Sequence, residues 1–135
     1  MIIYTLDQPG LIRWAGGIIG IKDFGPAFAM GIIGSGAIAA VAVFHNYRNP
    51  SIEVSMASVT PRWGTKEIFK ALTSYPFIQL NCRRITATTE AKNQSVRTFL
   101  QRFGFTEEGY HPHVFPDGDA VTYGLLRENC KWLER

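Results

Sequence analysis

The longest apolar stretch of the chain covers residues 24–44 and carries no charged side chain over 21 residues. About 20 apolar residues are enough for a transmembrane helix, but this stretch contains four glycines, six alanines, a proline and a serine, a composition that does not favour a span. A glycine on each side of Ser35 permits the positive φ angles of a tight hairpin turn. We therefore predict two antiparallel strands, 28–33 and 37–44, and no membrane helix. A phosphate-binding glycine loop is less favoured, because no Gly-Lys-Ser/Thr sequence follows.

A second strand pattern, alternating rather than continuous, covers residues 51–59. Ile52, Val54 and Met56 fall on one face of this strand, and Glu53, Ser55 and Ala57 fall on the other. Further strands are predicted at 2–4, 84–89, 105–114 and 120–127, the last two joined by a turn at 116–119.

Three helices follow from apolar spacing and end signals. The first begins near Asp7 and Pro9, with Leu11, Trp14, Ala15 and Ile18 on one face. The second covers 65–75, with Ile68, Ala71, Leu72 and Tyr75 at i, i+3, i+4 and i+7, and ends at Pro76. The third is capped by Asn93 and closed by Gly104, and its stripe is Val96, Phe99, Leu100 and Phe103.

The predicted order is therefore strand, helix, three strands, helix, strand, helix and two strands, which indicates one α/β domain over residues 1–135. A hydrophobic content of 46% and a charged content of 19% are typical of a globular protein. The net charge is +3 and no basic run exceeds two residues, so we predict no nucleic-acid partner. Cys82 and Cys130 lack metal-site spacing and nothing resembles a signal peptide, which indicates free thiols and a cytoplasmic protein.

Several short sequences, in order, resemble the GCN5-related N-acetyltransferase superfamily after about Phe28. They are Trp63-Gly64, Ala71-Leu72, Asn93, Phe99-Leu100, Gly104-Phe105, Glu108-Gly109 and residues 123–128. The set is most similar to the branch that acetylates N-terminal amines of ribosomal proteins. The resemblance implies a mixed, mostly antiparallel twisted sheet flanked by helices, with a splayed central pair of parallel strands. It also implies an enzyme that transfers the acetyl group of acetyl-coenzyme A to a primary amine, as a monomer or a homodimer.

The same resemblance implies where the cofactor lies. Its pantetheine arm fills the space between the strands 51–59 and 84–89, where a free backbone N–H meets the acetyl oxygen, and its pyrophosphate meets the first turn of the helix beyond Trp63. The implied cofactor-binding residues are Ala57, Ser58, Val59, Arg62, Trp63, Gly64, Thr65, Lys66, Asn93 and Arg102, and Arg97 lies on the same polar helix face as Arg102.

Two positions depart from the superfamily pattern. Lys66 stands where a second glycine lets backbone amides approach the phosphates, and Leu100 stands where many members carry a proton-donating tyrosine. These departures keep open an alternative: a catalytically inactive domain of the same fold that binds coenzyme A or a protein partner.

Glu53 is the candidate general base, since several members carry a glutamate on this strand, and His45 is the second candidate. Ser95 is the candidate general acid, although capping of the third helix would explain it equally well. Each candidate also has a structural explanation, a solvated sheet face for Glu53 and a strand end for His45. Neither cysteine occupies a position suited to a nucleophile, so direct attack by the amine is expected.

A histidine pair with nearby carboxylates is the remaining constellation. His111, His113, Asp117 and Asp119 contain the side-chain types of a zinc site. Turn residues separate the two pairs, and alternate positions of a strand readily hold two histidines, so we predict a structural role and no metal.

Overall fold

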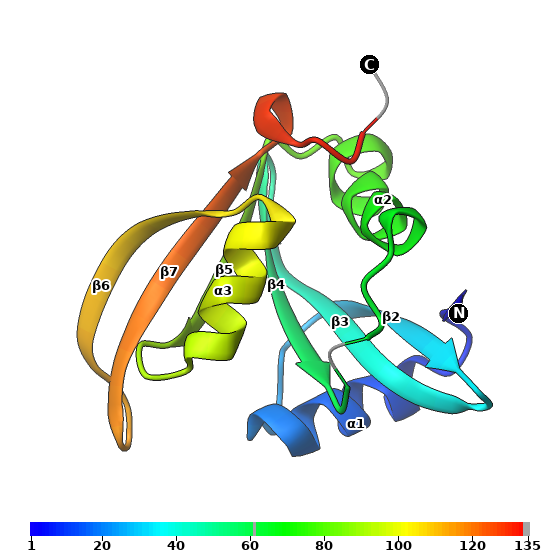
Figure 1. Ribbon diagram of the computed structural model, residues 1–135, viewed down its shortest axis with the longest axis horizontal. Coiled ribbons are helices and arrows are strands. Elements are labelled where there is room, and N and C mark those ends of the chain that lie inside the picture. Colours follow the sequence, from blue (N-terminus) through cyan, green and yellow to red (C-terminus); the bar gives the residue numbers. More distant parts are fainter. Residues whose placement is uncertain (61, 134–135) are drawn as a thin grey trace.

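The computed structural model describes residues 1–60 and 62–133, which form one sheet of seven strands with helices on both faces (Figure 1). The elements are β1 (Ile2–Tyr4), α1 (Gln8–Ile19), β2 (Ala27–Gly34), β3 (Ala37–Arg48), β4 (Ser51–Ser58), α2 (Lys66–Ser74), η1 (Tyr75–Gln79), β5 (Arg84–Glu90), α3 (Gln94–Phe103), β6 (Thr106–Phe115), β7 (Gly118–Leu126) and η2 (Arg127–Asn129). The strand order is β1-β2-β3-β4-β5-β7-β6, and β4–β5 is the parallel pair among the described strands. The predicted fold class and element order are confirmed.

The apolar stretch is a β-hairpin, as predicted. Gly34 pairs with Ala37 across the turn, and Ser35 and Gly36 have φ angles of 55° and 78°. Two consecutive positive φ angles match the right-handed twist of the flanking strands. Among the described residues no helix is both long and apolar enough to cross a membrane.

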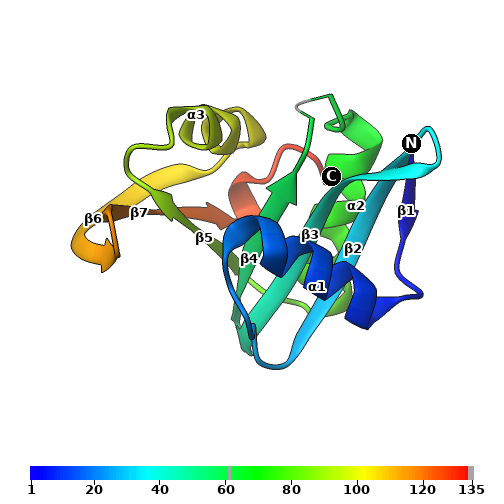
Figure 2. The same ribbon diagram turned by 90° about the horizontal axis from the view of Figure 1, so that it is seen from below.

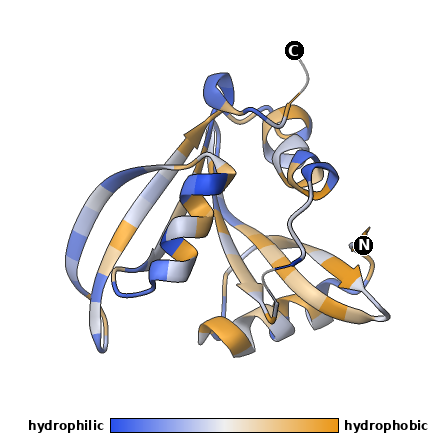
Figure 3. Ribbon diagram, in the orientation of Figure 1, coloured by the Kyte–Doolittle hydropathy of each residue, from blue (hydrophilic) through white to orange (hydrophobic). Residues whose placement is uncertain are grey.

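The continuous apolar character of β3 follows from burial on both faces. Figure 2 shows α1 lying across β2, β3 and β4 on one side of the sheet, while α2 and α3 lie on the other. Val41 and Val43 pack toward α1 with Leu11, whereas Ala42 and Phe44 belong to the larger core beneath α2 and α3. Figure 3 shows the contrast between the apolar hairpin β2–β3 and the largely hydrophilic β6. A strand covered on both faces reads as an unbroken apolar run.

The parallel pair β4–β5 is short because the strands separate. Three residue pairs join them, Ser51 with Arg84, Ile52 with Ile85 and Glu53 with Thr86, although both strands continue for several residues. In Figure 1 the two strands run together at the top of the view and diverge toward the bottom. The splayed central pair implied by the sequence is present. We call the diverging region the parted end and the opposite region the paired end.

Three details differ from the prediction. β3 continues to Arg48 rather than ending at residue 44, since it pairs with β4 through a tight connection at Asn49 and Pro50. Ile18 does not share the buried face of α1 and is 47% exposed, because it lies in the last turn of the helix, where the chain turns away. Pro76 does not end the second helical segment, which continues through the wider turn η1, where the missing proline N–H is tolerated.

Candidate active site

The parted end leaves backbone groups of β4 without a strand partner on one side. The Val59 N–H donates to the Ala39 carbonyl at 3.0 Å, so residues 57 and 59 direct their backbone groups toward β3. Backbone direction alternates along an antiparallel strand, and Met56 and Ser58 therefore face the side where β5 has moved away. Of the three residues expected to offer backbone groups, Ser58 is placed to do so, while the amides of Ala57 and Val59 are directed into the sheet.

At the parted end β5 is followed by α3, and the loop that leads from β4 to α2 also begins there (Figure 1). Thr65 caps α2 by accepting a bond from the Ile68 N–H at 3.3 Å. Arg62 and Lys66 are exposed on either side of this cap. The partial positive charge of a helix N-terminus and two cationic side chains together favour an anionic group such as a phosphate.

Trp63 and Gly64, in the loop before α2, have structural roles. The Trp63 side chain is 4% exposed and packs against Phe69 and Phe99, with ring centroids 5.8 and 5.2 Å away. Gly64 is required by packing, because a Cβ there would lie 2.5 Å from Cζ of Phe69. The expected cofactor contact of Trp63 is therefore limited to its backbone.

An aromatic cluster fills the space between α2 and α3. Phe69 is at its centre, with ring centroids 4.6 Å from Phe103 and 4.8 Å from Trp132. The Trp132 indole also donates to the Phe103 carbonyl at 2.6 Å, which ties the C-terminal segment to α3. The aromatic contacts hold the two helices together where the strands beneath them have separated.

On the α1 face of the sheet, the antiparallel pairing of β3 with β4 brings Glu53, His45 and Ser55 together. His45 lies opposite Glu53 in the register, and its Nδ1 is 4.0 Å from Glu53 Oε2. Its Nε2 lies 2.8 Å from Ser55 Oγ. Glu53 and Thr86 form the last pair before the strands diverge, so this polar group of three residues, which we call the His45 triad, lies at the start of the opening.

His45 is suited to accept a proton. The side chain is buried, and the Phe24 ring lies 5.4 Å from the imidazole. Burial lowers the pKa of His45 below its ordinary value of 6.5, and the negative charge of Glu53 opposes part of this shift. The imidazole is therefore neutral at pH 7. If its Nδ1–H faces Glu53, Nε2 accepts the hydrogen bond of the Ser55 hydroxyl.

Comparisons with solved structures identify the fold. A variant of the spermidine N-acetyltransferase SpeG from Vibrio cholerae superimposes with a TM-score of 0.76 at 13% identity, over 100% of this chain and 99% of that chain. A probable acetyltransferase superimposes with a TM-score of 0.70 at 20% identity, over 94% of this chain and 93% of that chain. The chain has the GCN5-related N-acetyltransferase fold. A ribosomal-protein alanine acetyltransferase from Vibrio fischeri superimposes with a TM-score of 0.69 at 14% identity, over 98% of this chain and 94% of that chain.

At these identities the likeness establishes the acetyltransferase fold alone. No family model matches the sequence, and no curated protein matches it. The acetyltransferases it resembles include spermidine and ribosomal-protein enzymes, so the fold does not single out the ribosomal-protein branch.

Several of the residues singled out in the sequence lie in α3 or at its N-cap. Asn93 caps the helix by accepting from the Val96 N–H at 3.3 Å, and the Ser95 hydroxyl donates to the same Asn93 oxygen at 3.1 Å. Leu100 is buried and offers no proton. Arg102 is exposed in the last turn, about 13 Å along the helix axis from the cap. The N-terminal turn of α3 is thus the part that borders the opening.

Arg97 serves the structure of this half of the sheet. Its guanidinium donates to the Tyr123 hydroxyl at 3.0 Å, to the Ala91 carbonyl at 2.9 Å and to Glu107 at 2.7 Å. These bonds hold α3 against β6 and β7. The Arg97 guanidinium, which was a candidate for contact with the cofactor phosphates, is therefore already hydrogen-bonded within the protein.

The carboxylate of Asp119 is committed to hydrogen bonds. It accepts from the Tyr110 hydroxyl at 2.6 Å and from the backbone N–H of His113 at 2.9 Å. His111 Nε2 lies 3.2 Å from the Thr122 hydroxyl. No group of three or more His, Cys, Asp or Glu side chains suited to a metal ion occurs within residues 1–60 and 62–133.

Ser55 is the site residue that sequence reasoning missed. A signal was present, because alternation places Ser55 on the same strand face as Glu53. The tight connection at Asn49 and Pro50 then brings His45 alongside both. Without the position of that turn, the register of the hairpin, and hence the partner of His45, could not be fixed.

Proposed function

We propose that the chain is an N-acetyltransferase that moves the acetyl group of acetyl-coenzyme A to a primary amine by direct attack. The observation that carries this proposal is the separation of β4 from β5 immediately beyond Glu53 and Thr86, with the His45 triad beside it. The pantetheine arm is proposed to lie in the opening, with its pyrophosphate at the first turn of α2 near Arg62, Gly64, Thr65 and Lys66. Asn93, at the start of α3, faces the arm from the other side.

The backbone N–H groups of Met56 and Ser58 are the proposed partners of the thioester carbonyl oxygen. Both face the opening and have no partner in the described part of β5. A fixed N–H donor stabilises the negative charge that develops on this oxygen during attack, and needs no reorganisation to do so.

The His45 triad is proposed to remove the proton of the acceptor amine. The amine nitrogen attacks the carbonyl carbon, its proton passes to the Ser55 hydroxyl, and the hydroxyl proton passes to Nε2 of His45. The C–S bond then breaks and coenzyme A leaves as a thiolate, which is a competent leaving group because thiol pKa values lie near 8.5. Glu53, 4.0 Å from Nδ1, stabilises the imidazolium that forms. Glu53 thus acts through His45, and the neutral state of the buried imidazole makes His45 the base.

Two observations favour a second candidate, a domain that binds coenzyme A without catalysis. Leu100 is buried where many enzymes of this superfamily place a tyrosine, and the Ser95 hydroxyl is engaged at the Asn93 cap. The proposed reaction has no protein group that protonates the thiolate. The test therefore separates binding from turnover.

The test is coenzyme A thiol release from acetyl-coenzyme A with three acceptors, namely spermidine, a peptide with an N-terminal alanine and a lysine-containing peptide with a blocked N-terminus. We expect amine-dependent thiol release and no acetyl adduct on the protein. His45→Gln should abolish most of it. The matched control is His113→Asn on β6, because asparagine tolerates the φ angle of 59° found there.

The outcomes distinguish the two candidates. Calorimetric binding of acetyl-coenzyme A without thiol release from any acceptor would favour the binding domain. Absence of binding would contradict both candidates. Equal loss of activity in His45→Gln and His113→Asn would show that His45 has no specific role in the mechanism. The proposal that the chain transfers acetyl groups would still stand.

A further inference from the structure

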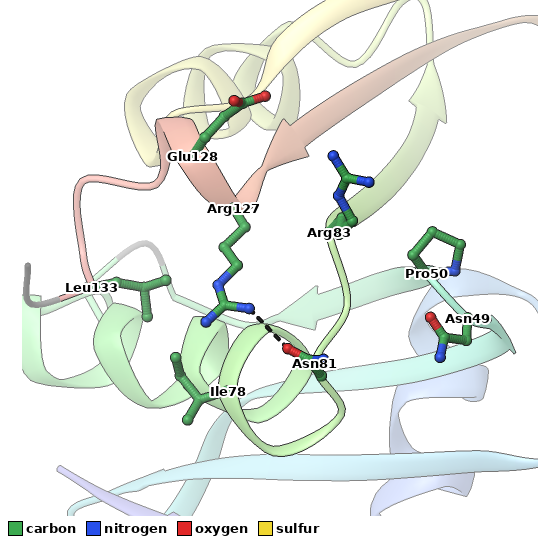
Figure 4. A pocket seen from close by; sticks show the side chains of 8 residues that line it. All are labelled: Asn49, Pro50, Ile78, Asn81, Arg83, Arg127, Glu128 and Leu133. Carbon is green, nitrogen blue, oxygen red and sulfur yellow. Dashed lines mark hydrogen bonds between the residues drawn. The ribbon is translucent and has the colours of Figure 1, made fainter.

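A cavity of about 610 Å³ lies at the paired end, on the opposite side of the β4–β5 pair from the proposed acetyl-coenzyme A site. Its walls come from three separate segments, which are the β3–β4 connection, η1 with the residues that lead from it to β5, and η2 with the C-terminal residues up to Leu133 (Figure 4). The volume falls within the range of small-molecule sites. We call it the basic pocket, and its lining includes Asn81, Arg83, Arg127, Glu128, Ile78 and Leu133.

Backbone hydrogen bonds fix the three segments against one another. The Arg83 N–H donates to the Pro50 carbonyl at 2.7 Å, and the Arg127 N–H donates to the Arg83 carbonyl at 3.1 Å. The Cys82 N–H, next to them, donates to the Pro76 carbonyl at 2.8 Å. The side chains around the pocket therefore project from a rigid frame, which lowers the cost of ordering them around a ligand.

The polar lining combines two arginines and two asparagines with one carboxylate, that of Glu128. Arg127 donates to the Asn81 side-chain oxygen at 2.9 Å, which orients its guanidinium and leaves the amide nitrogen of Asn81 as a donor. Figure 4 shows Arg83 projecting from the segment just before β5 with its guanidinium directed away from Asn81, and the Glu128 carboxylate lies on that same side of the pocket. Within residues 1–60 and 62–133 no carboxylate forms an ion pair with Arg83.

The chemistry of the lining selects an anion with an apolar body. A planar guanidinium binds carboxylate and phosphate oxygens through paired, charge-assisted hydrogen bonds. Ile78, which is 55% exposed, and Leu133 supply apolar surface in the same pocket. We propose that the basic pocket is a second ligand site, which binds a small organic carboxylate or phosphate with its anionic group on Arg83 and its apolar part on Ile78 and Leu133. This site does not depend on acetyl transfer.

Three probes test the site by isothermal titration calorimetry. They are phenyl phosphate, benzoate and uncharged benzamide, which share an aromatic ring and differ in charge. We expect phenyl phosphate or benzoate to bind and benzamide not to, and Arg83→Gln to weaken the bound anion about tenfold. The stronger of the two anions identifies the group that the site prefers.

A matched variant locates the binding. Lys66→Gln removes one exposed cation at the start of α2, where the phosphates of acetyl-coenzyme A are proposed to bind, and should leave probe affinity unchanged. If Lys66→Gln weakens binding of the anionic probe and Arg83→Gln does not, the proposal is overturned, because the anion would then lie at the parted end. Equal binding of benzamide, or no binding by either anion, would also overturn it. None of these results depends on thiol release, so they leave the proposed function untouched.

Discussion

The two ends of the β4–β5 pair contrast sharply although the same strands form both. At the paired end Pro50 accepts hydrogen bonds from the N–H groups of both Arg83 and Arg84, at 2.7 and 3.2 Å. At the parted end the ladder stops at Glu53 and Thr86, and Met56 and Ser58 face the space between the strands. One end is a fixed frame, and the other keeps backbone donors for a ligand.

The contrast shows how two adjacent strands can separate while each stays paired with its other neighbouring strand. β3 continues to pair with β4 along the parted end, and β7 continues to pair with β5. On the α2 face the aromatic cluster around Phe69 joins the helices that follow the two strands. The opening is therefore supported from outside the β4–β5 ladder.

The largest effect is expected from His45→Gln. Loss of a general base lowers kcat by roughly 10² to 10⁴-fold, while the affinity for acetyl-coenzyme A should not change, since His45 lies on the α1 face. Steady-state thiol release measures both quantities.

Glu53→Gln tests how Glu53 acts on His45. The negative charge of Glu53 raises the pKa of His45, so removal of this charge should shift the acidic limb of the kcat profile to lower pH. If Glu53→Gln instead removes that limb, Glu53 is the base.

Trp63→Ala tests the aromatic support of the parted end. Replacing this buried tryptophan should lower the free energy of unfolding by about 3–5 kcal/mol, measured by urea denaturation. The control is Ile78→Ala at the paired end, where the side chain is 55% exposed and the change should be within about 0.5 kcal/mol. Similar losses at the two positions would show that the cluster has no special role.

Gly64→Ala tests the close approach of Phe69. The new Cβ would lie 2.5 Å from Cζ of Phe69, and overpacking should destabilise the fold by about 1–3 kcal/mol. Gly17→Ala is the opposite case, because a Cβ there meets nothing within 4 Å inside α1. It should stabilise the protein by up to about 1 kcal/mol. Thermal unfolding should show a lower Tm for Gly64→Ala and a higher Tm for Gly17→Ala. Equal changes in Tm would contradict the packing argument.

Lys66→Gln should raise the KM for acetyl-coenzyme A by about two- to fivefold, as expected for one exposed charge near a helix N-terminus. The effect should diminish at high salt. Arg48→Gln, which removes an exposed cation from the end of β3, should leave the KM unchanged. A lower KM for Lys66→Gln would mean that the lysine obstructs the phosphates.

The smallest effect concerns stability against pH. The pKa of His45 is lower in the folded protein than its ordinary value of 6.5, so the unfolded chain binds more protons between these two values. The contribution of His45 is fully present above pH 6.5 and is lost as the pH falls through this window. Arg84 lowers the pKa of Glu108, and that contribution is lost only below about pH 4.5. The urea midpoint should decline between pH 7 and 5, and His45→Gln should remove this decline.

Local signals in the sequence predicted most of the fold. The alternation over 51–59, the caps Asn93 and Gly104 and the glycines around Ser35 each specify a local structure that the fold retains. The path through Pro76 was not predicted, because the wider turn η1 depends on packing that buries Phe77. Strand separation was implied by resemblance to a known superfamily and not by any local pattern.

The site was less accessible to sequence reasoning than the fold. Motif positions identified the loop before α2, but the burial of Trp63 and the engagement of Arg97 depend on residues far along the chain, namely Phe99 and Tyr123. The pairing of His45 with Ser55 depends on a hairpin register. Long-range contacts decide which polar side chains are available to a ligand, and these contacts cannot be predicted from the hydrophobic periodicity of the sequence.

The central claim is that Met56 and Ser58 keep their amides available in the opening. Residue-resolved amide hydrogen exchange, with and without coenzyme A, tests it most directly, with Ala57 as the internal reference because its amide faces β3. We predict rapid exchange at Met56 and Ser58 in the free protein, strong protection of both when coenzyme A is bound, and no change at Ala57. Slow exchange at Met56 and Ser58 in the free protein, unaltered by coenzyme A, would contradict the account.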